Sequence, residues 1–375
     1  MIEKYYNGVI EQVAGGIGNV EHNSILVRYS NDFSIWDLES VNHYKDQSDI
    51  FFTCHEFSYN KIAEAYEPYL GLIRQMFHKY CSGTLEEFME ECDVYKLQRP
   101  VFESYFEKGF CERTEQILID EVEYEQERMH SSIVTMLQKL SEICPIVIVL
   151  NRFQLASKST MQLTNRLLQT KNKNIGIVLG VNDVQSIPEF AHEEWDAICE
   201  SMDDRNMVYH IGNAGRNMEP DVMDYYSDYE SDDGYRKLNN LVYFLDFDQA
   251  DHHLSKIERR IKFDNFTISE KKHYQLLLLQ IMVSVLQRDI AKALESCEDL
   301  EKLQDQEKEG AFYYNFWMAT SYMYLGKLEE AMIYVQKAKE CGEALGDDFL
   351  VFRAELLKAQ NQMSGWCNIF FCAQD

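Results

Sequence analysis

The strongest constraint on the fold is a change in hydrophobic period part-way along this 375-residue chain. Up to about Asn206, short apolar runs rich in Ile and Val alternate with longer segments of helical spacing. This alternation predicts a parallel α/β sheet that is buried on both faces. The four runs are Ser24–Tyr29, Asp49–Cys54, Pro145–Leu150 and Asn174–Val181. Between the second and third runs, Thr84–Cys92 and Glu112–Ile143 predict a long helical insertion.

An acidic segment separates this part from the rest of the chain. Residues 219–234 contain seven acids, no base and little helical periodicity. Such a segment is typical of a mobile linker, and a docking peptide for a basic surface is the alternative. We therefore predict an α/β domain at residues 1–206, an acidic linker at 207–234 and a helical domain at 235–375.

The helical domain repeats itself. Its three alignable segments are Leu238–Arg260, Leu277–Leu300 and Asn315–Glu340. Each places an alanine at the same point, and these alanines are Ala250, Ala293 and Ala331. Their spacing is close to the ~34-residue tetratricopeptide period, and alanine suits a close crossing of two helices. With a tight turn at Gly326, the pattern predicts a tetratricopeptide-like array that binds a protein or peptide.

The end of the chain is unusual for such an array. Phe349–Met363 has the spacing of the first helix of a fourth repeat, and the last residues, 365–375, are mostly apolar. A solenoid normally ends in a helix with a polar outer face. Either this end folds back on the array, or the chain is part of a longer protein. We favour the second interpretation.

The first apolar run leads into a polar turn and a helix-like segment, the layout of a strand, a phosphate loop and a helix. In a P-loop, glycines expose backbone N–H groups to the phosphates, a lysine adds charge and a hydroxyl holds magnesium. Here the turn contains no glycine, and the first lysine after it is Lys45. Its residues are Ser30, Asn31, Asp32, Phe33 and Ser34. Asp32 would repel a phosphate, and Ser34 is a candidate relic of the magnesium-binding position.

The third run ends at a second position that matters for this chemistry. P-loop ATPases place an acid there for the magnesium shell, whereas this chain has Asn151. A neutral amide is a poor magnesium ligand and cannot act as a base. We therefore expect no catalytic residue and no cofactor. The alternative is an ATPase that binds ATP with magnesium and takes its lysine from Lys45, Lys61 or Lys158.

Composition excludes several other classes. Sixty-three acids against thirty-six bases give a net charge of −27, which argues against direct binding of nucleic acid or an anionic membrane. Ten cysteines without a C-x-x-C pair indicate reduced thiols rather than a metal site. The N-terminus lacks the features of a signal peptide, and no apolar stretch approaches ~18 residues. These observations predict a cytoplasmic protein.

The order of parts resembles the signal-transduction ATPases with numerous domains, the family of the bacterial maltose-regulon activator. The resemblance covers nearly the whole chain. It is carried by the N-terminal helix, the first two strands, "EAYEPYLGLI" (Glu64–Ile73), the third strand, "IGIVLGVND" (Ile175–Asp183) and the repeats.

By this resemblance, the degenerate Walker A loop falls on Ser30–Ile35, the Walker B acid falls on Asn151, and Asn182 is the polar sensor. The resemblance implies a bacterial signalling or transcription regulator with a pseudo-ATPase core. This chain would then be a regulatory scaffold, or the sensory half of a longer transcription or cyclic-dinucleotide regulator. The sequence leaves its oligomeric state open.

Overall fold

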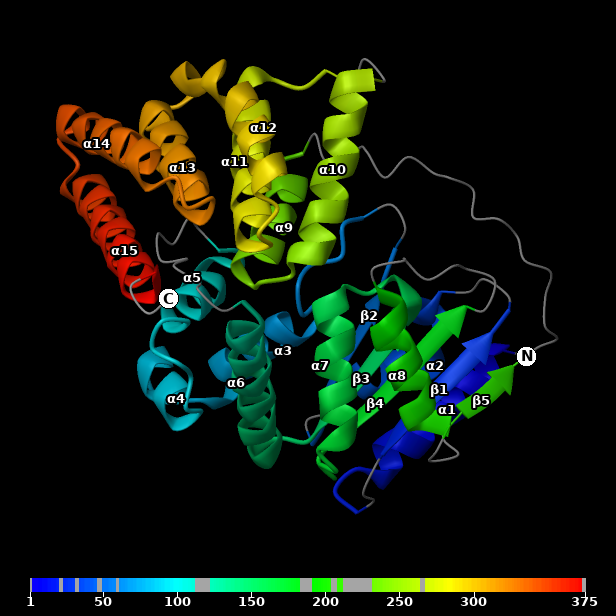
Figure 1. Cartoon of the computed structure of the whole chain (residues 1–375). Helices are drawn as coiled ribbons and strands as arrows, with labels where there is room; N and C mark the ends of the chain where they lie inside the picture. Colours follow the sequence, from blue (N-terminus) through cyan, green and yellow to red (C-terminus); the bar gives the residue numbers. More distant parts are fainter. Residues whose placement is uncertain are drawn as a thin grey trace. The chain divides into compact units, whose positions relative to one another are not determined.

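The computed structural model describes residues 2–19, 23–30, 34–45, 49–58, 61–111, 122–182, 191–203, 208–211, 231–263 and 267–372. By its internal contacts the chain divides into two compact units, Met1–Gln249 and Ala250–Asp375. The first contains the sheet and the second is helical (Figure 1). The expected order, an α/β domain followed by helices, is confirmed.

The first unit is built on five parallel strands in the order β2-β3-β4-β1-β5 (Figure 1). The strands are β1 (Ser24–Tyr29), β2 (Phe51–Glu56), β3 (Ile146–Asn151), β4 (Ile175–Asn182) and β5 (Val208–Ile211). The four apolar runs correspond to β1 to β4, so the predicted parallel sheet is confirmed. Strand β5 was missed. It has only four residues and lies inside the segment expected to be a linker.

Helices cover the sheet and form the insertion between β2 and β3. They are α1 (Ile2–Gly16), α2 (Glu39–Lys45), α3 (Tyr69–Tyr80), α4 (Leu85–Glu91), α5 (Arg99–Lys108), α6 (Val122–Ile143), α7 (Lys158–Gln169), α8 (His192–Asp203) and α9 (Asp232–Tyr243), with 3-10 turns η1 (Ile35–Asp37) and η2 (Phe153–Leu155). Side chains cap several of them: Thr84 forms a capping box with Glu87 at α4, and Ser157 caps α7. The expected helical insertion is present as α4 and α6, and residues 112–121 of its second segment lie outside the described residues.

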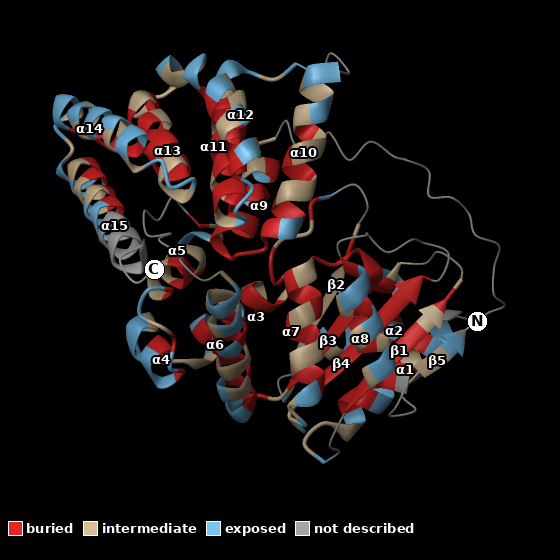
Figure 2. Cartoon of the chain, viewed as in Figure 1, coloured by how far each residue is buried: buried red, intermediate tan, exposed pale blue. Residues whose placement is uncertain are grey.

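Glycines in β4 allow α1 to lie close to the sheet. An added Cβ at Gly176 would lie 2.6 Å from Val13 Cγ1 of α1, and one at Gly180 would overlap the Tyr6 hydroxyl. Strands β3 and β4 are buried throughout (Figure 2). The apolar side chains of α1, α2, β1, β3 and β4 form one core on this face of the sheet.

Helix α9 belongs to the first unit, although sequence analysis groups residues from 235 onward with the repeats. Two of its side chains bond to the insertion. Asn239 Nδ2 donates to the Cys111 carbonyl at 2.6 Å, and Asn240 Nδ2 donates to Glu64 Oε2 at 2.9 Å. The Phe244 ring, just after α9, lies edge-on to Tyr66 with centroids 6.0 Å apart. Most of the expected linker, residues 212–230, lies outside the described residues.

The second unit is a series of helical hairpins. It comprises α10 (Phe247–Phe263), whose first turn lies in the first unit, α11 (Glu270–Leu286), α12 (Ile290–Glu301), η4 (Gln304–Gln306), α13 (Gly310–Tyr324), α14 (Leu328–Leu345) and α15 (Asp348–Cys372). Its core is rich in aromatic rings, among them Phe312, Phe316 and Trp317 of α13. Helix α11 is mostly buried, whereas α14 shows an exposed outer side (Figure 2).

Three hairpin turns share one backbone geometry. Leu245, Arg288 and Gly326 have φ of 67°, 65° and 72°, in the left-handed region. The next residue of each turn donates its N–H to a carbonyl five positions back, over 2.8, 2.8 and 3.0 Å. These bonds join Asp246 to Leu241, Asp289 to Ser284 and Lys327 to Tyr322. They form a repeated Schellman-type helix end.

The repeat-packing residues predicted from sequence follow these turns at equal intervals. Ala250, Ala293 and Ala331 are each fully buried, and Gly326 occupies the left-handed position of its turn. A fully buried alanine at the same step of each hairpin agrees with a close approach of neighbouring helices.

Candidate functional site

The carboxyl edge of the sheet has the topology of a ligand site. From β1 the chain runs toward β2, and from the neighbouring β4 it runs toward β5, which lies on the other side. In open parallel sheets, ligands bind outside the carboxyl ends of strands at such a switch point. Tyr29, the last residue of β1, pairs with Asn182, the last residue of β4.

Asn151, at the Walker B position of the resemblance, is fully buried and is bonded across this edge. The Tyr29 hydroxyl donates to Asn151 Oδ1 at 2.7 Å, although the two residues are 122 positions apart in the chain. Gly180 of β4 makes room for this contact, because an added Cβ there would lie 2.5 Å from Asn151 Oδ1. The Tyr6 ring lies edge-on to Tyr29 with centroids 6.5 Å apart.

Glu56, the last residue of β2, connects Ser34 of the turn after β1 with Asn151 at the end of β3. Asn151 Nδ2 donates to its Oε1 at 3.4 Å, and the Ser34 hydroxyl donates to its Oε2 at 3.5 Å. Arg152 Nε lies 3.5 Å from Oε1. The structure therefore brings Ser34 and Asn151 together through a carboxylate of the chain itself.

Glu56, Tyr29 and Arg152 are the residues of this site that sequence reasoning missed. Each stands at or next to the carboxyl end of a predicted strand. Parallel strands present these ends at one edge, so the strand boundaries contained a signal that could have found them. Arg152 has φ of 53°, an uncommon conformation for a residue other than glycine and one that clusters at functional sites.

The neighbouring phenol is neutral. Burial, and then the nearby Tyr29 and Glu56, raise the pKa of Tyr6 well above its ordinary value of 10. A phenol is already protonated at neutral pH at its ordinary pKa, so Tyr6 adds no charge to the edge, and the raised pKa extends this to higher pH.

The loop after β1 is described only in part. Ser30 is partly buried, whereas Asn31, Asp32 and Phe33 lie outside the described residues. Ser34 caps η1, and its hydroxyl accepts the Trp36 N–H at 3.3 Å. The candidate relic of a magnesium-binding hydroxyl thus bonds to backbone and to Glu56.

Asn182, the sensor position of the resemblance, is buried at the end of β4. Its backbone N–H donates to Gln154 Oε1 at 3.4 Å, and its carbonyl accepts from Gln154 Nε2 at 3.5 Å. These bonds join the end of β4 to the turn that follows β3.

Two of the three candidate lysines have contacts with other side chains. Lys158 Nζ lies 2.5 Å from Asp248 Oδ2 and 3.6 Å from Glu194 Oε1. Lys45 Nζ lies 4.5 Å from the centroid of the Trp36 ring. Lys61 is exposed, and its charge contributes to lowering the pKa of His55.

A partly buried acidic pair, Glu64 and Glu67, lies in the loop between β2 and α3. Burial, and then the neighbouring Glu67, raise the pKa of Glu64 to about 7. Burial also raises the pKa of Glu67, whose Oε1 lies 3.6 Å from His55 Nε2. Burial, and then Lys61, lower the pKa of His55 to about 4, so this contact joins a neutral imidazole to the acid at neutral pH.

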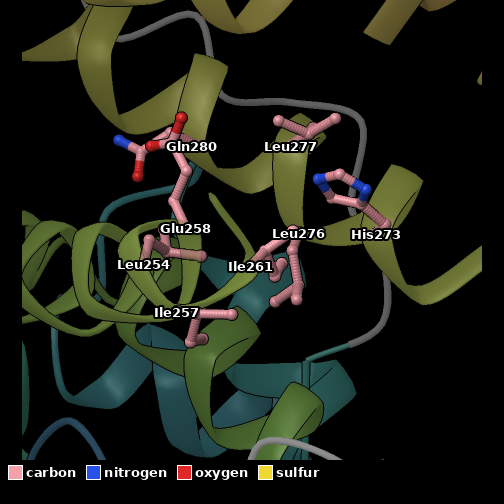
Figure 3. A pocket seen from close by; sticks show the side chains of 8 residues that line it. All are labelled: Leu254, Ile257, Glu258, Ile261, His273, Leu276, Leu277 and Gln280. Atoms are coloured by element: carbon pink, nitrogen blue, oxygen red, sulfur yellow. The ribbon is translucent and has the colours of Figure 1, made fainter. Parts of the chain in front are cut away.

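A small hollow of the second unit lies between α10 and α11. Figure 3 shows its lining side chains, which are mostly apolar. They are Leu254, Ile257, Glu258, Ile261, His273, Leu276, Leu277 and Gln280. The cavity measures about 10 Å³, room for about one water and far less than a small-molecule ligand occupies. We assign no ligand to it.

Within the described ranges, no cluster of three or more His, Cys, Asp or Glu side chains has the geometry of a metal site. No helix in this part of the chain combines the length and apolarity needed to cross a bilayer. The cysteines with described side chains are free thiols, and four of them, Cys92, Cys111, Cys144 and Cys297, are buried.

The chain matches no family model, no curated protein and no solved structure.

Proposed function

We propose that this chain is a cytoplasmic regulatory scaffold in bacterial signalling or transcription. In this proposal the α/β unit is a pseudo-ATPase core of the P-loop type, and the hairpins are a tetratricopeptide-like array that binds a protein or peptide. The single observation that carries the proposal is the position and hydrogen bonding of Asn151. It stands where an ATPase would hold a carboxylate, and its carbonyl is already taken by Tyr29.

Two further features support the pseudo-ATPase part. Glu56 brings a negative charge to the edge where a triphosphate would lie, and like charges repel. The turn after β1 contains neither glycine nor lysine in its sequence. A nucleotide would therefore lack the backbone donors and the point charge that hold its phosphates.

The hairpins support the binding part. Their turns and alanines repeat, as in solenoids that present extended binding surfaces. Helix α15 also exposes apolar side chains. Phe349 is 39% exposed and Phe352 is 60% exposed, with ring centroids 6.5 Å apart. Two neighbouring exposed rings on one helix support a surface that binds another protein.

The test is isothermal titration of the full chain with ATP in the presence and absence of magnesium. We expect no saturable heat. Micromolar, magnesium-dependent binding would overturn the pseudo-ATPase proposal in favour of an ATP-binding signal-transduction ATPase. In that case, ATP turnover by K45A, K61A and K158A would show whether one of these lysines supplies the missing charge.

A further inference from the structure

Two hydrogen-bond donors and a guanidinium, from two places in the sequence, converge on one carboxylate at the sheet edge. Ser34 comes from the start of η1, Asn151 from the end of β3 and Arg152 from the turn after β3. All three lie 3.4–3.5 Å from the Glu56 oxygens. The Glu56 side chain is only 13% exposed, so these groups replace much of its hydration.

This donor set is suited to an anion. The hydroxyl and the amide N–H donate, the guanidinium adds a positive charge, and arginine is the preferred residue for carboxylates and phosphates. The orientation of the amide is also fixed. Because Tyr29 donates to Asn151 Oδ1, the Asn151 Nδ2 is the atom that faces Glu56. Tyr29 is thus a positioning residue for this donor.

We propose that Glu56 is an internal ligand, filling an anion site formed by Ser34, Asn151 and Arg152. This proposal rests on the pseudo-ATPase function proposed above and says what occupies its degenerate edge. The external ligand of the same site is a small oxyanion of the phosphate class, which Glu56 excludes in the wild-type chain. A tethered carboxylate competes well because its binding costs no association entropy.

The same arrangement makes a structural prediction. Removing the Glu56 charge leaves a half-buried guanidinium without this counter-ion, which destabilises the fold. A phosphate that enters the site would replace the lost charge. Phosphate should therefore stabilise the Glu56 variants and leave the wild-type chain unchanged.

The experiment compares E56A and E56Q with the wild type and with E142A, which removes an exposed acid from α6. Inorganic phosphate is titrated into each full-length protein by calorimetry, and thermal midpoints are measured with and without phosphate. We expect E56A and E56Q to bind phosphate at least about tenfold more tightly than the wild type or E142A. The double variant E56A/R152Q should lose this gain, and Y29F/E56A should lose part of it.

Equal phosphate affinity in wild type, E142A and folded E56A and E56Q would overturn the internal-ligand proposal. E56Q keeps the size of the side chain, so it decides the question if E56A does not fold. Failure of the proposed function is distinguishable from these outcomes. It would be seen as magnesium-dependent ATP binding to the wild-type chain, which the phosphate titrations do not measure.

Discussion

The sheet edge and the hairpin turns are built on opposite principles. At the edge, contacts join residues far apart in sequence, such as Tyr29 with Asn151 and Ser34 with Glu56. In each turn, the decisive bond spans five residues, as from Asp289 to Ser284. The edge therefore exists only when the whole α/β unit is folded, whereas each turn can form from its own segment.

This difference predicts how far the effect of a substitution should spread through the structure. A change at the edge disturbs several strands together, because its groups share partners. A change in one turn should stay within one hairpin, because solenoid units interact mainly with their neighbours.

The largest expected loss of stability comes from a substitution at the sheet edge. In G180A, the added Cβ meets the Tyr6 hydroxyl and Asn151 Oδ1, so one of these buried groups must shift. Overpacking of this kind should lower the free energy of unfolding by about 3 kcal/mol. Urea unfolding measures it. In the control G71A, the added Cβ in α3 meets no atom within 4 Å, and the variant should gain about 0.5–1 kcal/mol.

A smaller effect is expected inside a hairpin. A331L places a large side chain at a fully buried position of α14 and should cost about 2 kcal/mol. The control A344L changes an exposed alanine of the same helix and should be nearly neutral. Hydrogen exchange should show the loss of protection of A331L in the hairpins and not in β1, β3 or β4. Equal loss in the sheet would contradict the contrast between the two regions.

The loop between β2 and α3, which contains Glu64 and Glu67, makes the stability of the first unit depend on pH. The pKa of Glu64 is about 7 in the folded chain against an ordinary value of 4.5. The folded state therefore holds this proton more tightly, and stability present below about pH 4.5 is lost as pH rises to 7. E64Q keeps an acceptor for Asn240 and should be about 1.5 kcal/mol more stable than wild type at about pH 8.

The pH dependence of this stability gain tests the prediction. The difference between E64Q and wild type, measured by urea unfolding across the range, should vanish near pH 4.5. A gain of equal size at both ends of the range would show that ionisation of Glu64 is not its cause.

The smallest effect tests whether the hairpin turns are equivalent. G326A puts a Cβ on a backbone with φ of 72° and should cost about 1 kcal/mol. R288G relieves the same backbone at φ of 65° but loses the stacking of Arg288 on the Tyr324 ring, 4.1 Å away. The free energy gained by relieving the backbone and the free energy lost with the stacking are of similar size. R288G should therefore be nearly neutral in thermal unfolding. A large loss in R288G would mean that the two turns differ.

By itself, the sequence determined strands β1 to β4, the repeated hairpins and the buried alanines. Apolar runs and helical spacing are local signals, and burial of each run against its neighbours follows from them. Of the three left-handed turn positions, only Gly326 is a glycine that indicates a turn in the sequence. Leu245 and Arg288 adopt the same conformation without glycine, because the rest of the hairpin compensates the cost of a side chain there.

Tertiary structure alone decided the polar edge. The loss of glycine, lysine and acid was readable from Ser30–Ser34 and Asn151, but it did not reveal what replaced them. Glu56 and Tyr29 reach these residues because the sheet places the ends of β1, β2 and β3 at one edge and because Gly180 carries no side chain. Short strands such as β5 and the inclusion of α9 in the first unit likewise depend on long-range packing, which no local pattern records.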